Sequence, residues 1–226
     1  QSFEGIGPGK AESALTAARN NHDRIVGGNV DVHPAFFGLC RKLAEAAVEA
    51  GADMVNDVWA LRMDSDMGPL VADLGIPLIL MHNRSRPKDA AQAARLGGRY
   101  VGVHYDDLVL DVLEALQARL DHALQLSIPH EQIILDPGLG FGKTVRQNLT
   151  LLNRADEFRS LGQPILLGPS RKSFIGYTLD LPPERRTAGT LAAIAFAIAR
   201  NGVDIVRVHD VDAAVQVCRL ADAMAS

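Results

Sequence analysis

The sequence predicts an α/β fold of the (β/α)8 TIM-type barrel class, and three observations carry that prediction. Short strand-like segments alternate with helix-like segments from residue 38 onward. The predicted strands are almost continuously apolar, as in IPLILMH, which is typical of parallel strands buried on both faces. Polar residues stand at the carboxyl end of each strand, where the loops of such a barrel gather on one face. No GxGxxG motif follows the first of these strands, which weakens the doubly wound alternative.

The first half of the pattern holds two helices and two strands. Residues 38–50 are rich in helix formers, and a second helical stretch ends at Gly75, a residue suited to a helix C-terminus. Residues 52–57 and residues 76–82 are the strands that follow these helices. Residues 83–104 are polar and irregular, and we expect a functional loop there because the stretch is too long for a simple turn.

The second half holds two helices and three strands. Residues 106–126 carry leucine and valine at helical spacing. The three strands are QIILDPG, PILLGPSRK and DIVRVHD, at residues 132–138, 164–172 and 204–210. Between the last two strands, residues 187–202 form an almost wholly apolar helix, which we expect to be well buried.

We expect a single domain over residues 1–226, with an atypical part at residues 1–45. A complete barrel needs three strands beyond the five predicted here, and a typical barrel has about 250 residues. Only about 50 residues precede Ala52, so the barrel is expected to be incomplete in its N-terminal βα units. Residues 23–33 (DRIVGGNVDVH) are one plausible strand and turn within that part.

Composition excludes some classes of partner. The net charge is −4 with 22% charged residues, whereas nucleic-acid-binding proteins usually carry a basic face. No apolar run approaches the roughly 20 residues that span a bilayer. The two cysteines, Cys40 and Cys218, form no CxxC motif, which is typical of reduced thiols. We therefore expect a cytoplasmic protein with neither nucleic-acid nor membrane partners.

Two strand ends carry groups suited to a flat heterocycle. Asp136 stands in DPGLGFGK, where its carboxylate could accept two parallel hydrogen bonds from an amino-pyrimidine edge. The alternative is that Asp-Pro-Gly is only a turn. Asn56 ends residues 52–57 and offers both a donor and an acceptor; its alternative is a turn or a helix N-cap. Asp57 is expected to be a cap.

Two other strand ends carry cations. Arg207 and His209 alternate along their strand, so both are expected on one side, and the forked donors of arginine suit a diphosphate. The alternative for Arg207 is an ion pair with Asp57 or Asp136. Lys172 could donate to a ring carbonyl or nitrogen while its stem packs against the ring.

These motifs resemble those of the dihydropteroate synthase family. The matching stretches, in the family's order, are GADMVNDV, LILMHNR, LDPGLGFGK, LLGPSRKSFIG and VRVHDV. The resemblance implies a TIM-type barrel that condenses 6-hydroxymethyl-7,8-dihydropterin diphosphate with p-aminobenzoate to give dihydropteroate and diphosphate. It also implies Mg²⁺ bound largely by the diphosphate and water, small-molecule substrates, and a homodimer.

The resemblance also implies roles for individual residues. The pterin-binding set is Asn56, Asp136, Gly168, Lys172 and Arg207. The p-aminobenzoate-binding set is Phe141 and Ser173, and the diphosphate-binding set is Arg207 and His209. Alternatives are core packing for Phe141, a plain N-cap for Ser173 and a tight barrel contact for Gly168. No metal ligand and no covalent catalytic residue is expected.

The N-terminal part departs from the family pattern. Of the family's NVTPDSF-like segment, only Ser2–Phe3 has a counterpart, and the segment like GGESTRPG is matched only by residues 27–35 (GGNVDVHPA). Phe37 stands where the family has an Asp-Thr pair, and Asp31 is out of register. Two alternatives therefore stay open. One is a catalytically impaired pterin-binding homologue, and the other is a pterin-dependent methyltransferase, a group without the SRKSF segment.

Overall fold

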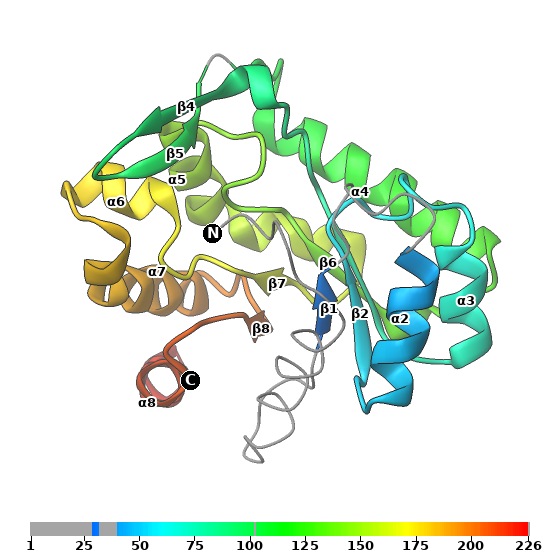
Figure 1. Cartoon of the computed structure of the whole chain (residues 1–226). Coiled ribbons are helices and arrows are strands. Elements are labelled where there is room, and N and C mark those ends of the chain that lie inside the picture. Colours follow the sequence, from blue (N-terminus) through cyan, green and yellow to red (C-terminus); the bar gives the residue numbers. More distant parts are fainter. Residues whose placement is uncertain (1–28, 32–39, 102, 226) are drawn as a thin grey trace.

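A computed structural model describes residues 29–31, 40–101 and 103–225, and its parallel strands form the wall of a barrel (Figure 1). Strands β1 (Asn29–Asp31), β2 (Met54–Asp57), β3 (Leu78–Met81) and β6 (Ile133–Asp136) pair in parallel in that order. Strands β7 (Leu166–Leu167) and β8 (Ile205–Val206) pair in parallel, and a bridge between Leu135 and Ile165 joins them to β6. Successive parallel strands that pair in chain order are the arrangement of a (β/α) barrel.

Helices follow the strands and cover the outside of this wall. Those of the first half are α2 (Cys40–Glu49), α3 (Met67–Leu74) and α4 (Leu108–Gln125). Those of the second half are α5 (Val145–Asn153), α6 (Ser173–Leu179), α7 (Thr187–Ala199) and α8 (Val211–Ala225). Short 3₁₀ turns are η2 (Pro87–Asp89), η3 (His130–Gln132), η4 (Ala155–Leu161) and η5 (Pro183–Arg185).

Local chemistry sets several helix ends. Gly75 ends α3 in the left-handed region at φ 62°, as its position in the sequence predicts. The Asp107 carboxylate accepts two backbone N–H bonds at the start of α4. Thr144 and Gln147 form a reciprocal capping box at the start of α5. The predicted helices therefore begin and end within a few residues of the observed ones.

The strands divide their side chains between two faces. Val55, Leu80, Leu135 and Leu167 belong to the apolar cluster that the helices also enter. Because neighbouring residues of a strand point to opposite faces, the residues next to these in sequence face the barrel interior. Asn56 and Asp136 are among them, and both are fully buried.

The prediction of an irregular loop at residues 83–104 is wrong. The segment contains an antiparallel hairpin of β4 (Ala90–Ala93) and β5 (Gly97–Tyr100), which lies beside α6 (Figure 1). Tyr177 of α6 donates to the Gly97 carbonyl at 3.0 Å, and buried Arg186 donates to the Leu96 carbonyl at 2.9 Å. The strand propensity of AAQAARLGGRY is low, so contacts from distant residues hold this hairpin in place.

The prediction that the apolar helix at residues 187–202 is well buried holds for one face only. Helix α7 buries one face, through Thr190, Ala193, Ile194 and Ala197, and packs against α8. Phe196, on another face, is 45% exposed. Apolar composition does not show which face of a helix is buried, and in α7 one apolar face is buried while another is exposed.

The N-terminal predictions are tested only in part. Strand β1 lies within the predicted strand and turn of residues 23–33 and places Asp31 opposite Asn56 of β2. Ser2–Phe3 and Phe37 lie outside the described residues.

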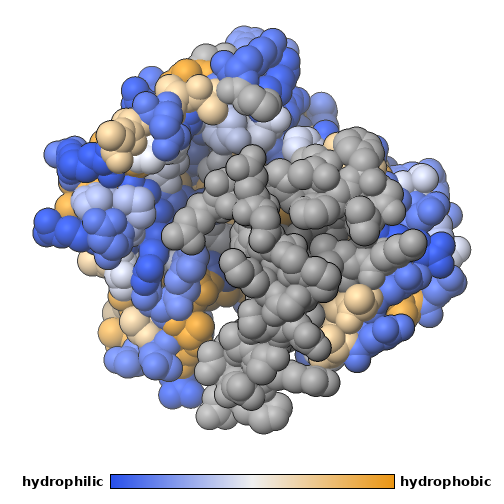
Figure 2. Space-filling model, in the orientation of Figure 1, coloured by the Kyte–Doolittle hydropathy of each residue, from blue (hydrophilic) through white to orange (hydrophobic). Residues whose placement is uncertain are grey.

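The visible surface of the molecule is mostly polar. The view in Figure 2 shows mostly hydrophilic residues around the visible rim, with separate apolar spots. None of the described helices is both long and apolar enough to cross a bilayer.

Candidate functional site at the carboxyl ends of the strands

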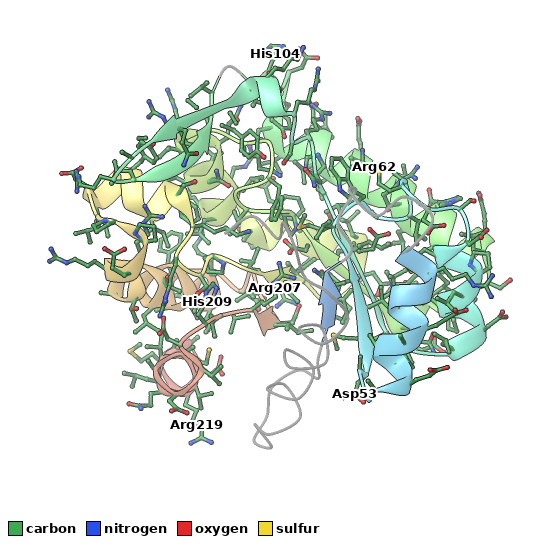
Figure 3. All side chains as sticks on the ribbon, viewed as in Figure 1. Asp53, Arg62, His104, Arg207, His209 and Arg219 are labelled. Atoms are coloured by element: carbon green, nitrogen blue, oxygen red, sulfur yellow. The ribbon has the colours of Figure 1, made fainter. Side chains whose placement is uncertain are left out.

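Asp136 and Arg207 form an ion pair at the centre of the candidate site. Asp136 ends β6 and is fully buried, and its Oδ1 accepts the backbone N–H of Gly138 at 2.7 Å. Its Oδ2 lies 3.7 Å from Nη2 of Arg207, which follows β8 (Figure 3). The backbone N–H of Arg207 donates to the Leu167 carbonyl at 3.0 Å, so the β7–β8 pairing holds the arginine in place. The ion pair with Asp136 weighed for Arg207 is confirmed.

This ion pair leaves polar atoms without partners. Among the described residues, no group donates a hydrogen bond to Asp136 Oδ2, and none accepts one from Arg207 Nη1. The guanidinium lies over Gly168, where an added Cβ would stand 3.2 Å from Nη2. Buried polar atoms almost always have hydrogen-bond partners, so these two atoms are suited to a polar ligand.

Lys172 and Phe141 come together from segments 31 positions apart in the sequence. Lys172 follows β7, and its Nζ donates to the Leu139 carbonyl and lies 4.4 Å from the Phe141 ring centroid. Its stem lies against Gly140, where an added Cβ would come within 2.9 Å of Cδ. Phe141 is partly exposed, so core packing does not account for it. The lysine and the ring therefore form one surface on the loop that follows β6.

Glycines shape the loop of residues 137–142 that carries Phe141. Gly138 has φ +73°, and an added Cβ would lie 1.9 Å from the His82 carbonyl oxygen. Gly142 has φ +63°, and an added Cβ would lie 2.4 Å from the Arg84 carbonyl carbon. Only glycine adopts this conformation this close to another backbone without strain. The glycines of GLGFGK therefore allow the loop backbone to pack closely against the segment that follows β3.

His209 and Ser173 lie in the segments that follow β8 and β7. His209 Nδ1 lies 2.7 Å from Ser170 Oγ, which also accepts the His209 backbone N–H at 3.1 Å. These two contacts hold the imidazole ring and its backbone against Ser170. Ser173 is the first residue of α6, and the N-cap is Lys172, so the plain N-cap alternative for Ser173 is wrong.

Asn56 and Asp57 have different environments at the end of β2. Asn56 pairs in register with Ile79 of β3, which pairs with Ile134 of β6, so it lies two strands from Asp136 on the interior face. Asp57 accepts backbone N–H bonds from Trp59 at 2.8 Å and from Leu61 at 2.6 Å. Burial raises the pKa of Asp57, and these backbone bonds oppose the rise. The expectation that Asp57 caps backbone groups is confirmed, for a turn instead of a helix.

A buried lysine that the sequence analysis did not single out lies beneath the loop, against the strand-end His82. Lys143 is 2% exposed, and its Nζ lies 2.9 Å from His82 Nδ1. The same nitrogen donates to the carbonyls of Gly138 at 2.8 Å and Phe141 at 3.0 Å. The signal was present in the sequence, because Lys143 closes the GFGK motif and His82 ends a strand.

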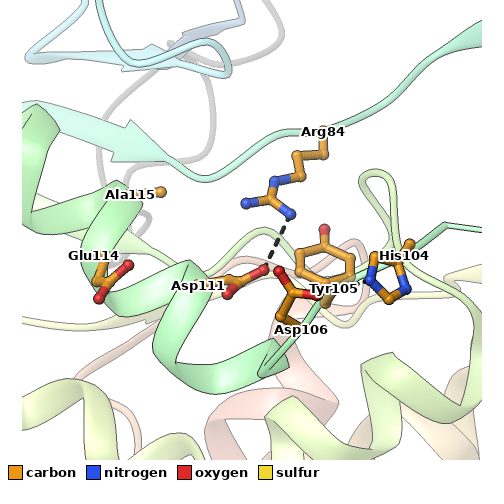
Figure 4. A pocket seen from close by; sticks show the side chains of 7 residues that line it. All are labelled: Arg84, His104, Tyr105, Asp106, Asp111, Glu114 and Ala115. Atoms are coloured by element: carbon orange, nitrogen blue, oxygen red, sulfur yellow. Dashed lines mark hydrogen bonds and ion pairs between the residues drawn. The ribbon is translucent and has the colours of Figure 1, made fainter.

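A cavity of about 450 Å³ is lined by α4, by Arg84 and by residues 104–106 (Figure 4). Arg84 pairs there with Asp111 at 3.2 Å and lies 4.5 Å from the Tyr105 ring centroid. The Tyr105 hydroxyl donates to the Gly142 carbonyl at 2.9 Å, and burial raises its pKa to about 12. None of the residues predicted to bind a ligand lines this cavity.

Comparison with known proteins identifies the family. The family model described as pterin binding enzyme matches residues 40–209. A dihydropteroate synthase of Synechocystis is 44% identical over 184 residues, which are 81% of this chain and 60% of that protein. The chain belongs to the dihydropteroate synthase family of pterin-binding enzymes. This membership confirms the resemblance drawn from the strand-end motifs.

Solved structures of the family share the fold. A dihydropteroate synthase of Coxiella burnetii, in complex with pteroic acid, matches with a TM-score of 0.76 and 32% identity over 95% of this chain and 73% of that one. The enzyme of Xanthomonas albilineans with 4-aminobenzoic acid matches with a TM-score of 0.71 and 37% identity, over 87% and 66% of the two chains. The predicted TIM-barrel class is confirmed by these matches and by the parallel strand order.

The match is partial in length. The chain spans 57% to 60% of the length of the curated relatives from Clostridium beijerinckii, Synechocystis and Bacillus subtilis. The stretches that carry the site, from β2 to the segment after β8, lie within the matched residues 40–209. The ligand roles of the individual residues stay predictions.

Proposed function

We propose that this protein binds a pterin at the carboxyl ends of its strands and acts as a dihydropteroate synthase. The observation that carries the proposal is the buried Asp136–Arg207 pair, with Oδ2 and Nη1 lacking partners in the described part of the chain. Family membership supports the reaction class. The Xanthomonas albilineans relative has been solved both with 4-aminobenzoic acid and with 7,8-dihydropteroate, which supports the same substrate classes here.

The pterin is proposed to bind edge-on to Asp136. The free Oδ2 and the carboxylate's remaining lone pairs would accept the amino and ring N–H groups of the pterin. Asn56, fully buried two strands away, would meet the opposite side of the ring with its amide. Lys172 would donate to the ring carbonyl or a ring nitrogen, and Gly168 would leave room for close approach to β7.

The second substrate is proposed to bind beside the surface formed by Phe141 and Lys172. The partly exposed ring of Phe141 offers an apolar contact for the ring of p-aminobenzoate. The hydroxyl of Ser173, one residue beyond Lys172, would donate to the carboxylate of that substrate. This arrangement directs the amine toward the methylene carbon of the pterin.

The chemistry is a displacement at that methylene carbon. The nitrogen lone pair of the amine forms a C–N bond, the C–O bond to diphosphate breaks, and its electron pair leaves with the diphosphate. The amine then loses a proton. Arg207 and His209 would stabilise the departing charge, and the site would contribute mainly positioning and electrostatic stabilisation.

Magnesium is part of the proposal only as a companion of the diphosphate. The described residues contain no cluster of three or more His, Cys, Asp or Glu side chains able to hold a metal ion. The residues therefore do not form a cage of their own, and Mg²⁺ commonly binds through substrate phosphates and water. No step above passes through the metal.

Oligomeric state and location are further proposals. Exposed apolar side chains on the outer helices, Phe196 at 45%, Leu220 at 62% and Met224 at 71%, support a homodimer. The mildly acidic composition supports a cytoplasmic protein that binds neither nucleic acid nor membrane. Sedimentation measurements would test the homodimer directly.

Calorimetry with an oxidised or dihydro pterin tests the central contact. Asp136→Ala is expected to weaken pterin binding about 100-fold, or about 2.7 kcal/mol, because it removes the acceptor from a buried site. Asp73→Ala, at an exposed position of α3, is the matched control and should bind as the wild type does. Equal affinity of Asp136→Ala and the wild type would contradict the pterin site.

An assay of diphosphate release separates the two remaining functions. Turnover with p-aminobenzoate is expected for a synthase. Pterin binding without turnover would instead favour a catalytically impaired pterin-binding homologue, the alternative that the departures at residues 1–45 motivate. The curated relatives are named as dihydropteroate synthases, which favours that class over a pterin-dependent methyltransferase.

A further inference from the structure

Lys143 is a fully enclosed cation with a specific set of acceptors. Moving an ammonium from water into a protein interior is costly unless each N–H has a partner. The three N–H groups of Lys143 have three acceptors within 3.0 Å: His82 Nδ1, the Gly138 carbonyl and the Phe141 carbonyl. Because each N–H of this buried side chain has an acceptor, the fold holds Lys143 in one specific conformation.

Charge states follow from this geometry. In its ammonium form Lys143 donates all three of its hydrogens, and His82 then accepts at Nδ1 and carries its proton on Nε2. Burial, and then the charge of Lys143, lower the pKa of His82, which keeps the ring neutral. Burial holds the pKa of Lys143 well below its usual value, and the charge of Asp136 opposes this lowering only in part.

The acceptors of Lys143 lie on the loop that carries the predicted p-aminobenzoate contact. Asp136 is held by β6, so the start of the loop needs no further support. The middle of the loop is not supported by a strand. Lys143 holds it through hydrogen bonds to the carbonyls of Gly138 and Phe141. Asn148 continues the network, since it accepts the Gly140 N–H at 2.6 Å and donates to the Lys143 carbonyl at 3.1 Å.

We propose that Lys143 and His82 are a positioning pair that holds the loop of residues 137–142 in place, and so sets the affinity for the p-aminobenzoate substrate. This inference rests on the function proposed above. Neither residue touches a substrate: Lys143 acts through the Phe141 carbonyl, and His82 acts through Lys143. The pair is distinct from Lys172, which bonds a different carbonyl of the same loop, that of Leu139, and lies over the Phe141 ring.

Steady-state kinetics of Lys143→Met test the pair. The methionine fills a similar volume without donors, so the loop should move while Asp136 stays on β6. The KM for p-aminobenzoate is expected to rise at least about tenfold, and pterin affinity measured by calorimetry should change less than about threefold. Lys88→Met, at an exposed lysine of η2, is the matched control and should behave as the wild type does. A role in folding alone would lower the melting temperature and the active fraction without this selective change in KM.

Rescue at the partner position gives an independent test. His82→Asn keeps a side-chain acceptor close to the position of Nδ1, whereas His82→Leu removes it. His82→Asn is expected to stay within about threefold of the wild-type KM, and His82→Leu to approach the value of Lys143→Met. The double variant with Lys143→Met and His82→Leu should be no worse than Lys143→Met alone, because the two act through one contact.

Hydrogen exchange measured by mass spectrometry reports on the loop without any substrate. Peptides that cover residues 137–142 should take up deuterium faster in Lys143→Met and in His82→Leu, while peptides from α4 keep their wild-type rates. Unchanged exchange together with an unchanged KM overturns the positioning pair and leaves the proposed function standing. Absence of pterin binding and turnover in the wild type would overturn the proposed function, and faster exchange in the variants would then leave only the loop-holding part.

Discussion

The two faces of the loop at residues 137–142 differ in how their polar groups are satisfied. On the face toward the helices, Lys143 Nζ has three acceptors, and Tyr105 and Asn148 bond to the backbone of the same segment. On the face toward the barrel interior, Asp136 Oδ2 and Arg207 Nη1 have no hydrogen-bond partner among the described residues. A satisfied face gives rigidity, and an unsatisfied face gives a place for a ligand. Changes on the first face should therefore act on stability and on loop position, and through the loop on p-aminobenzoate. Changes on the second face should act on pterin affinity.

The largest effect is expected from Gly138→Ala. The added Cβ would lie 1.9 Å from the His82 carbonyl oxygen, at a φ of +73° that side chains rarely adopt. We expect the free energy of unfolding to fall by about 3 kcal/mol or more, measured by urea denaturation.

Gly97→Ala is the matched control for this change. Gly97 has a similar φ of +70°, but an added Cβ would meet nothing within 4 Å. The cost there should be only the backbone strain of about 1 kcal/mol. Equal losses in the two variants would show that the close approach to His82 has no importance.

A moderate effect is expected from acid. The pKa of His82 lies well below 6.5, first because of burial and then because of the charge of Lys143. Below pH 6.5 the unfolded chain therefore binds a proton that the folded chain does not, so stability falls as the pH drops from 7 to 5, by up to about 1.4 kcal/mol per pH unit. The charged and titratable groups that face this ring are Lys143, Arg84, Arg62 and Tyr105.

Denaturation at a series of pH values measures this slope. His82→Asn should flatten it, because the titrating ring is gone. His130→Asn is the control, since His130 is exposed on η3 and its surroundings change little on folding. A slope in His82→Asn equal to that of the wild type would assign the acid sensitivity to other groups.

The smallest effect is expected from Tyr105→Phe. The change removes one hydrogen bond, from the hydroxyl to the Gly142 carbonyl, and leaves the ring in place. The free energy of unfolding should fall by about 1 kcal/mol, and pterin affinity should stay within about twofold. A large loss of pterin affinity in Tyr105→Phe would contradict the separation of the two faces.

Much of the fold could be predicted from local pattern. The apolar runs at β3 and β6 are buried on both faces, so their composition alone identifies them as parallel strands. Gly75 marks a helix end by its backbone freedom. The hairpin of β4 and β5 could not be predicted, because bonds from Tyr177 and Arg186, roughly 80 to 90 positions away, hold it.

The candidate site also has a part that the sequence predicts and a part that it does not. Asp136, Arg207 and Lys172 could be named because each follows an apolar strand, and strand ends meet on one face of a barrel. The partners that the fold then gives them could not be read from the sequence. Arg207 pairs with Asp136 across 71 positions, and Lys143 bonds His82 across 61. Such pairs depend on how strands separated in the chain are placed side by side.

The sequence by itself determined a fold of parallel strands alternating with helices and which polar residues stand at the strand ends, because alternation and apolar runs are local properties of the chain. The strand-end motifs, through their resemblance to a known family, added the barrel class. Only the tertiary structure decided which of these residues meet. It turned one face of α7 outward, folded residues 90–100 into a hairpin, and enclosed Lys143 among three acceptors. The physical reason is that burial and hydrogen-bond partners are properties of the assembled fold, where the free energy of a polar group depends on neighbours that its own segment does not contain.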